Sequence, residues 1–387
     1  MASAADRAST NAADGDAVWS AFDATRLANA ATAALRAYDP GHDLPALRKR
    51  FGAAIAELGS NENPLGPSPL AIDAMRSALG ETFRYPDPRG LSLKSALSAK
   101  LGVAIDRIAL GNGSHELLML LAQCFADPSH SVVFSQYGFA VFPIATAASG
   151  AIALRVPALS GSHPIAPYGH DLEAIATAVR GDTRLVYLAN PNNPTGTWFE
   201  DAALDRFVAR TSREVLIVVD EAYAEYVDAP NLSSALRLAD HHPNLIVTRT
   251  FSKAYGLAGL RVGYLVAHPS VVAVIERLRE SFNVNNIALA AAEAALGDAS
   301  HLAKAVAFNR SERDWLSEEL AGRDYRALPS QTNFVLVDLG RDAADFERHL
   351  FERGVIVRPM VGYGLAHTVR ISVGSRAENQ RLLDALP

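Results

Sequence analysis

The sequence contains a single cysteine, Cys124, among its 387 residues. One cysteine excludes an internal disulfide framework and fits a reducing compartment, so we expect a cytoplasmic location. Cys124 lies in an apolar helical pattern, and we interpret it as a core residue rather than as a nucleophile. The histidines, including the adjacent His241 and His242, lack the spacing of metal ligands. We therefore predict no metal site.

The sequence also lacks an excess of positive charge and long apolar runs. Lysine and arginine number 36 against 42 acidic residues, which gives a net charge of −6 and no electrostatic support for nucleic-acid binding. No apolar run approaches the ~18 residues of a membrane-spanning helix, so we predict no membrane span. Residues 1–17 are rich in Ala, Ser and Asp and have no apolar core segment, which predicts a disordered lead rather than a signal peptide.

What the chain does contain is an alternation of apolar strands and helical patterns. Hydrophobic residues make up 49% of the sequence, enough for a large core. Runs such as 185–189, 215–219 and 245–248 alternate with helices, which predicts an α/β protein with a mostly parallel central sheet flanked by helices. Later strands predict a smaller α/β domain. The expected division is 1–17 lead, 18–60 N-terminal arm and part of the small domain, 61–275 large domain, and 276–387 small domain.

The stretch from Thr250 to Arg261, T-F-S-K-A-Y-G-L-A-G-L-R, follows one of these strands. A lysine held by small residues at the end of a buried strand is poorly hydrated, which favours the neutral, nucleophilic amine. The hydroxyls of Thr250 and Ser252 and the guanidinium of Arg261 are suited to holding a phosphate. Amine and phosphate clamp together suggest pyridoxal phosphate bound to Lys253 as a Schiff base. Taken alone, Lys253 is better interpreted as a surface lysine in a turn, and it is the segments described next that favour the cofactor.

Other polar residues stand at the carboxyl ends of the predicted strands. Asn193 lies in the loop N-P-N-N-P-T-G, which two prolines and a glycine hold in one geometry. Asp220 ends an apolar run, where a carboxylate is costly unless it is paired, and a protonated pyridine nitrogen is a suitable partner. Ligand sites of parallel sheets lie beyond these strand ends, so Asn193, Asp220 and Lys253 are expected to converge.

An anion site is predicted where strand 107–110 runs into Gly111-Asn112-Gly113-Ser114 and then a helix. The free N–H groups and the dipole of a helix N-terminus favour negative charge. The turn differs from the G-x-G-x-x-G fingerprint, so it gives no reason to infer NAD.

With Asn193, Asp220, Tyr223, Lys253 and Arg261 in this order, the chain resembles the fold-type-I, pyridoxal-phosphate-dependent aminotransferases. Within them it is most similar to the histidinol-phosphate aminotransferases. The motifs that carry the likeness extend from Asn61 to Gly374: N-E-N-P-x-G-P-S-P, R-Y-P-D, G-N-G-S-x-E, N-P-N-N-P-T-G, D-E-A-Y, F-S-K-A-Y-G-L-A-G-L-R-V-G and V-R-I-S-V-G.

The resemblance implies a set of cofactor contacts. Lys253 would bind the cofactor's aldehyde carbon and later carry a proton between the substrate Cα and the cofactor. Asp220 would keep the ring nitrogen protonated, Asn193 and Tyr223 would hydrogen-bond the phenolic oxygen, and Tyr137 would stack on the ring. The phosphate would be held by the backbone N–H groups of Ser114 and His115, by Thr250, Ser252 and Arg261, and by Tyr85 of a neighbouring subunit. The expected active unit is therefore a homodimer.

On the substrate side, the resemblance implies that Arg370 pairs bidentately with a carboxylate, a geometry that lysine cannot reproduce. Tyr38, Asn333 and Arg358 are further candidates for the substrate's side chain or its phosphate. Two departures from the family pattern bear on the cofactor contacts. His115 stands where the family often has Asp, and Ser135-Gln136-Tyr137 stands where it usually shows P-x-Y.

The expected activity is the transfer of an amino group between L-histidinol phosphate and 2-oxoglutarate by a ping-pong mechanism, in histidine biosynthesis. Three alternatives stay open. The first is an aminotransferase of broad specificity for aromatic amino acids. The second is a pyridoxal-phosphate-dependent decarboxylase of a phosphorylated amino acid, because the sequence does not show which bond at Cα is aligned for cleavage. The third is a non-catalytic binding protein, against which the joint presence of Lys253 and Asp220 argues.

Overall fold

The computed structural model describes residues 22–33, 35, 43–52 and 55–387. The chain divides into two compact units, Met1–Ala37 and Tyr38–Pro387. The described part of the first unit contains two short helices, η1 (Ala24–Leu27) and α2 (Ala30–Ala33). The predicted lead, 1–17, and Tyr38 lie outside the described residues. All that follows concerns the second unit.

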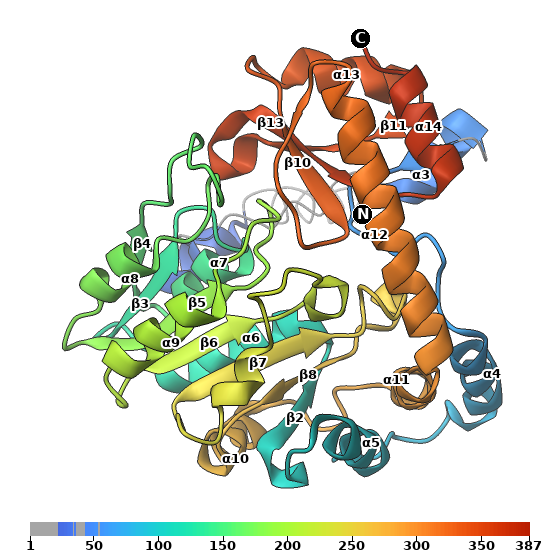
Figure 1. Cartoon of the computed structure of the whole chain (residues 1–387). Helices are drawn as coiled ribbons and strands as arrows, with labels where there is room; N and C mark the ends of the chain where they lie inside the picture. The colour runs from blue at the N-terminus through green and yellow to red at the C-terminus, as the bar shows by residue number, and fades with distance from the viewer. Residues whose placement is uncertain (1–21, 34, 36–42, 53–54) are drawn as a thin grey trace, which may run out of the picture. The chain divides into compact units, whose positions relative to one another are not determined.

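A seven-stranded sheet with the order β2-β8-β7-β6-β5-β3-β4 forms the centre of this unit (Figure 1). Strands β4, β3, β5, β6 and β7 run parallel, and β8 is antiparallel to both β7 and β2. The prediction of a mostly parallel sheet is confirmed. The strands are β2 (Ile108–Gly111), β3 (Ser131–Ser135), β4 (Ile152–Val156), β5 (Thr183–Ala189), β6 (Leu216–Asp220), β7 (Leu245–Thr250) and β8 (Gly263–Val266).

Helices cover both faces of this sheet because alternate strand side chains point to opposite sides. On one face, Tyr187 of β5 packs with α6 (Gly113–Phe125), α7 (Val141–Ala148) and α10 (Pro269–Leu278). On the other, Val186 and Leu188 pack with α8 (Leu172–Ala178) and α9 (Asp201–Arg210). A third cluster beside β2 and β8 joins α4 (Pro69–Ala78), α5 (Leu91–Leu101) and α11 (Asn286–Gly297). The sheet is therefore buried on both faces except along its edge strand β4, where Ile152, Ala153 and Arg155 are exposed.

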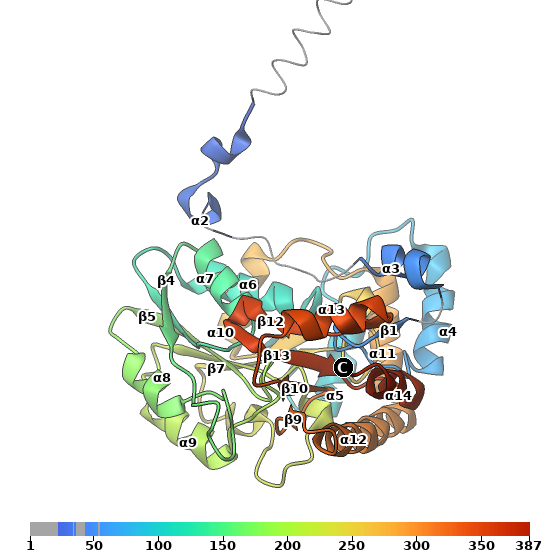
Figure 2. The same cartoon turned by 90° about the horizontal axis from the view of Figure 1, so that it is seen from above.

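A second, four-stranded sheet is antiparallel and has the order β12-β13-β10-β9. Beside it, β1 (Ala56–Glu57) pairs in parallel with β11 (Val355–Ile356). Three helices pack on these strands, α12 (Ala299–Ala321), α13 (Ala344–Glu352) and α14 (Arg376–Asp384), and α12 and α14 lie side by side in Figure 2. The strands are β9 (Arg326–Ala327), β10 (Phe334–Asp338), β12 (Arg358–Met360) and β13 (Leu365–Ser372).

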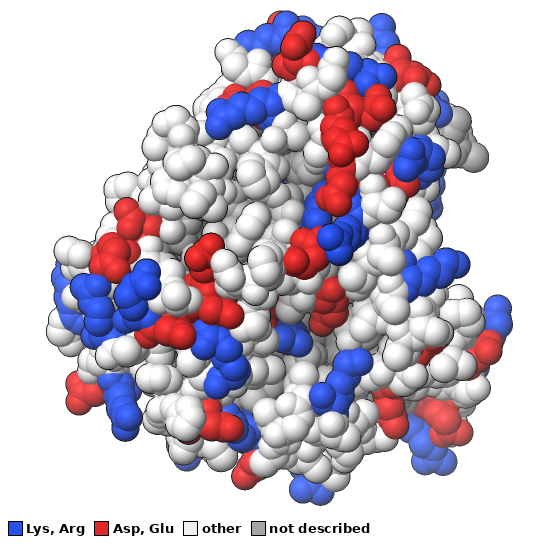
Figure 3. All heavy atoms as spheres, in the orientation of Figure 1, with Lys and Arg blue, Asp and Glu red and all other residues white. Residues whose placement is uncertain are grey.

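The remaining helices are short. They are α3 (Leu44–Phe51), η3 (Leu79–Glu81), η4 (Ile105–Arg107), η5 (Ala224–Tyr226), η6 (Ala235–Leu238), η7 (Ala258–Leu260) and η8 (Val361–Tyr363). The domain boundary near residue 276 stays a prediction, and α11, which follows it, packs against α4 and α5. Acidic and basic side chains are interspersed on the face shown in Figure 3. Among the described residues, no helix combines the length and the apolar character needed to cross a membrane.

Candidate active site

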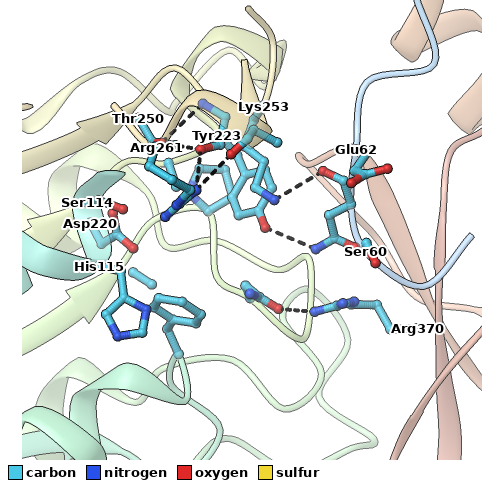
Figure 4. A pocket seen from close by; sticks show the side chains of 18 residues that line it. Ser60, Glu62, Ser114, His115, Asp220, Tyr223, Thr250, Lys253, Arg261 and Arg370 are labelled. Carbon is cyan, nitrogen blue, oxygen red and sulfur yellow. Dashed lines mark hydrogen bonds between the residues drawn. The ribbon is translucent and has the colours of Figure 1, made fainter. Parts of the chain in front are cut away.

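A cavity of about 290 Å³ opens at the carboxyl ends of β5, β6 and β7, and we call it the central cavity (Figure 4). Its walls come from the strand ends, from the start of α6, from the segment after β1 and from β13. The lining residues are Ser60, Asn61, Glu62, Ser114, His115, Phe139, Ala189, Pro191, Asn193, Asp220, Ala222, Tyr223, Thr250, Ser252, Lys253, Ala258, Arg261 and Arg370. Most residues predicted from the sequence to bind a cofactor therefore share one cavity.

Asp220 ends β6 and is only 4% exposed. Its Oδ1 accepts a hydrogen bond of 2.8 Å from the hydroxyl of Thr248, its register partner on β7. Burial raises the pKa of the Asp220 carboxyl to about 7, against the lowering effect of the Thr248 hydroxyl. A carboxylate held in so poorly hydrated a position is suited to a cationic partner such as a protonated ring nitrogen.

Lys253 follows β7 and extends its amine into the same cavity. Its Nζ donates a hydrogen bond of 3.1 Å to the backbone carbonyl of Asn61. Burial lowers the pKa of the Lys253 amine to about 8, and the nearby guanidinium of Arg370 acts in the same direction. A substantial fraction of the amine is therefore neutral near pH 8, as a nucleophile toward an aldehyde must be.

Tyr223 and Asn193 both line the cavity. Tyr223 is 3% exposed, burial raises the pKa of its phenol, and its hydroxyl accepts a hydrogen bond of 3.0 Å from Asn61 Nδ2. Asn193 Oδ1 accepts a hydrogen bond of 2.7 Å from Nη1 of Arg370, which links the loop after β5 to strand β13. Figure 4 shows Arg370 and Tyr223 reaching the cavity from different elements.

An anion cradle lies at the β7 and α6 end of the cavity. Thr250 and Ser252 share a hydroxyl–hydroxyl hydrogen bond of 2.9 Å, and Arg261 Nη1 donates to Ser252 Oγ at 3.3 Å. Ser114 lies in the first turn of α6, a 13-residue helix whose N-terminal N–H groups favour an anion. Gly113 has a φ of 77°, which favours glycine, and a Cβ there would lie 2.7 Å from Arg261 Nη2. Hydroxyls, guanidinium and helix terminus together fit a phosphate group.

His115 also lines this end of the cavity. Burial lowers the pKa of its imidazole, and the neighbouring Arg261 charge lowers it further. The neutral ring therefore adds no positive charge to the cradle near neutral pH. A backbone contact of His115 with an anion does not depend on the identity of its side chain.

Tyr137 does not line the central cavity. Its ring packs edge-on against Tyr168, with centroids 5.6 Å apart, and its hydroxyl accepts a hydrogen bond from Gln136. Phe139, two residues later, lines the cavity instead. Of these two aromatics only Phe139 lines the cavity, and the stacking role of Tyr137 stays a prediction.

Three other predicted residues also lie outside the cavity lining. Asn333 is 1% exposed, and its Nδ2 donates to the backbone carbonyls of Asn61 and Glu62, so it holds the cavity wall. Arg358 on β12 is the register partner of Arg370 on β13. Tyr85 is 82% exposed, stacks on Phe282 with centroids 4.7 Å apart, and lines a separate surface groove.

Sequence reasoning assigned no role to Asn61, Thr248 or Phe139. The only available signals were the N-E-N-P motif for Asn61 and the second aromatic after β3 for Phe139. Thr248 is recognisable only through its pairing with Asp220 across two strands. Within the described part of the chain, no group of His, Cys, Asp and Glu residues could hold a metal ion.

The chain belongs to the aminotransferase class I and II family, whose family model matches residues 53–386. It is similar to histidinol-phosphate aminotransferase 2 of Pseudomonas aeruginosa, with 47% identity over 93% of this chain and 96% of the relative. Histidinol-phosphate aminotransferase 1 of Nitrosococcus oceani is 46% identical, with the same coverage of both chains.

Solved structures give the same classification of the fold. The histidinol-phosphate aminotransferase of Sinorhizobium meliloti, solved in complex with pyridoxal-5′-phosphate, matches with a TM-score of 0.83 and 34% identity over 95% of this chain and 98% of that chain. An aspartate aminotransferase variant of Thermus thermophilus, at 23% identity, matches in fold with a TM-score of 0.80 over 92% of this chain and 98% of that chain. The predicted fold class and family are confirmed.

Proposed function

We propose that this chain is a pyridoxal-phosphate-dependent aminotransferase that moves an amino group between L-histidinol phosphate and 2-oxoglutarate. The observation that carries the proposal is the convergence of a lysine amine of lowered pKa and a buried aspartate in one cavity. Relatives that are 46–47% identical across 93% of the chain bear the name histidinol-phosphate aminotransferase, which supports this choice of substrate.

The residues of the central cavity fit pyridoxal phosphate at both of its charged ends. The anion cradle of Thr250, Ser252, Arg261 and the α6 N-terminus would hold the phosphate, and Asp220 would hold the protonated ring nitrogen. When bound, this cofactor supplies an aldehyde that condenses with amines and a ring that takes up an electron pair from the substrate Cα.

The reaction also requires groups that orient the ring and move a proton. Lys253 Nζ, in its neutral form, would accept the proton from the substrate Cα and then donate it to the cofactor. Tyr223 and Asn193 would orient the ring by hydrogen bonds to its phenolic oxygen. Phe139, which lines the cavity, would cover the ring face and exclude water from it.

Two arginines on neighbouring strands are proposed to recognise the substrates. Arg370 lines the cavity and is braced by Asn193 Oδ1 and by the carbonyl of Gly59, which accepts from Nη2 at 2.7 Å. A guanidinium braced in this way presents a fixed fork to the carboxylate of 2-oxoglutarate. Arg358 is paired with Arg370 across β12 and β13, so it is placed to add positive charge for the substrate phosphate. Asn333 maintains the cavity wall, and Tyr38 remains a candidate by resemblance alone.

We also propose a homodimer in which Tyr85 of each chain reaches the phosphate in the partner's cavity. The support is that Tyr85 is 82% exposed and stands outside the lining of its own cavity. Mixing Tyr85→Ala chains with Lys253→Ala chains tests this arrangement, since each hybrid dimer would contain one intact site. Mixtures no more active than the separate variants would contradict it. A cytoplasmic location is proposed on the single cysteine alone.

A substrate screen of the protein loaded with pyridoxal phosphate tests the function. We expect glutamate formation from L-histidinol phosphate and 2-oxoglutarate, at a kcat/KM well above that for phenylalanine, and none with Lys253→Ala. A preference for phenylalanine would instead identify an aromatic aminotransferase. Release of carbon dioxide from a phosphorylated amino acid without any oxo-acid acceptor would identify a decarboxylase.

A further inference from the structure

Asn61 occupies an unusual position in the wall of the central cavity. It is 2% exposed and has a φ of 55°, in the left-handed region that asparagine tolerates better than most residues. Its carbonyl accepts hydrogen bonds from Lys253 Nζ at 3.1 Å and from Asn333 Nδ2 at 3.0 Å. Its side-chain amide bonds Tyr223 and Ser372. One residue thus contacts the lysine and the tyrosine of the site.

The hydroxyl of Ser372 fixes which end of the Asn61 amide faces which neighbour. Ser372 Oγ accepts the backbone N–H of Asn61 at 2.8 Å, so its own proton is available to Asn61 Oδ1 at 3.2 Å. A hydroxyl has only one proton to donate. With Oδ1 turned toward Ser372, Nδ2 must face the hydroxyl of Tyr223, 3.0 Å away.

This orientation also fixes the direction of the Tyr223 proton. The amide N–H occupies an acceptor position of the phenol oxygen, and an amide nitrogen accepts no hydrogen bond in return. The hydroxyl proton of Tyr223 must therefore point away from Asn61. Because Tyr223 lines the central cavity, the open direction leads toward the position assigned above to the cofactor's phenolic oxygen.

We propose that Asn61, anchored by Ser372, is a positioning residue that keeps the hydroxyl of Tyr223 a hydrogen-bond donor into the central cavity. This inference rests on the proposed function, because it needs an acceptor in the cavity. Asn61 would thus set the direction in which the hydroxyl proton of Tyr223 points toward the cofactor.

Three substitutions separate this role from a structural one. Asn61→Asp keeps the shape of the side chain but replaces the donor Nδ2 with an acceptor, so the Tyr223 proton turns to the new carboxylate. Asn61→Gly keeps the left-handed backbone and the carbonyl but leaves the Tyr223 hydroxyl free to donate into the cavity. Tyr223→Phe removes the hydroxyl altogether and should give the largest change in the pH titration of the cofactor.

The measurement is a pH titration of the cofactor's visible absorbance in the loaded protein. A hydrogen bond donated to the cofactor's ionised phenolic oxygen stabilises the deprotonated form of the cofactor and so lowers the midpoint pH of this titration. We expect Asn61→Asp and Tyr223→Phe to raise the midpoint by about one unit each, the size of one charge-assisted hydrogen bond. The double variant should shift no further than Tyr223→Phe alone, and Asn61→Gly should stay near the wild type.

Ser372→Ala provides the test if Asn61→Asp fails to fold. Without the serine, both ends of the amide can face Tyr223, so the midpoint should rise by less than in Asn61→Asp and with the same sign. An unchanged midpoint in Asn61→Asp, or in Ser372→Ala where that variant carries the test, would overturn the inference. Equal shifts in Asn61→Gly and Asn61→Asp would overturn it as well. A wild-type chain that takes up no pyridoxal phosphate would instead refute the proposed function.

Discussion

Replacing Asp220 with asparagine should stabilise the cofactor-free protein in a way that depends on pH. Burial raises the pKa of this carboxyl from its ordinary value of 3.8 to about 7. The folded protein therefore holds the proton more tightly than the unfolded chain. The resulting stabilisation is fully present below pH 3.8 and is lost as the pH rises through 7. The introduced amide would have no charge to bury, while its oxygen could still accept the Thr248 hydroxyl.

The size of the effect follows from the shift in pKa. Three pH units correspond to about 4 kcal/mol of unfolding free energy at pH 8. With an unfolding entropy of ~2.1 cal/mol/K per residue, a chain of this length should gain roughly 5 °C in Tm. At pH 4 the two proteins should melt within about 1 °C of each other. Other buried groups, such as His170, are common to both proteins and cancel in the difference.

The assay is thermal unfolding of both cofactor-free proteins, at matched concentration, from pH 4 to pH 8. Addition of pyridoxal phosphate gives the second arm. The wild type should then gain more than Asp220→Asn, because only the carboxylate can pair with a protonated ring nitrogen, and the variant should lose nearly all turnover. A difference in Tm that stays constant across the pH range would refute the assignment of a buried, destabilising charge to Asp220.

Four further substitutions test other parts of the protein. Arg370→Lys loses a bidentate fork and should raise the KM for 2-oxoglutarate about 30- to 100-fold in steady-state kinetics, and an unchanged KM would show that another residue holds the carboxylate. Phe139→Ala should weaken pyridoxal phosphate binding at least about tenfold in equilibrium titrations, whereas Tyr137→Ala should weaken it by no more than about threefold. The reverse ranking would identify Tyr137 as the residue that stacks on the ring. Glu221→Gln breaks the buried 2.7 Å ion pair with Arg249 and should lower the free energy of unfolding by about 3–5 kcal/mol. Thermal unfolding should then show a Tm lower by roughly 5 °C. An unchanged Tm would count against a stabilising role for this pair.

The convergence of Asn193, Asp220 and Lys253 was predictable because each follows an apolar run and parallel strands end at one edge of a sheet. The edge-on packing of Tyr137 against Tyr168 was not, since it depends on how the chain turns after β3 rather than on residue order. The contacts of Asn61 could not be predicted from the sequence for a different reason. The structure brings it next to residues that are 162 and 311 positions away, and no local pattern encodes such pairs.

That last separation has a consequence for how the protein is made. The Asn61–Ser372 contact joins positions 311 residues apart in a chain of 387, and Arg370 in the same strand completes the cavity wall. A nascent chain emerging from the ribosome can build most of the central sheet early, but it cannot complete the central cavity until β13 has been made. Prematurely terminated products that lack β13 would therefore retain Lys253 but lack Arg370 in the cavity wall and the Ser372 anchor of Asn61.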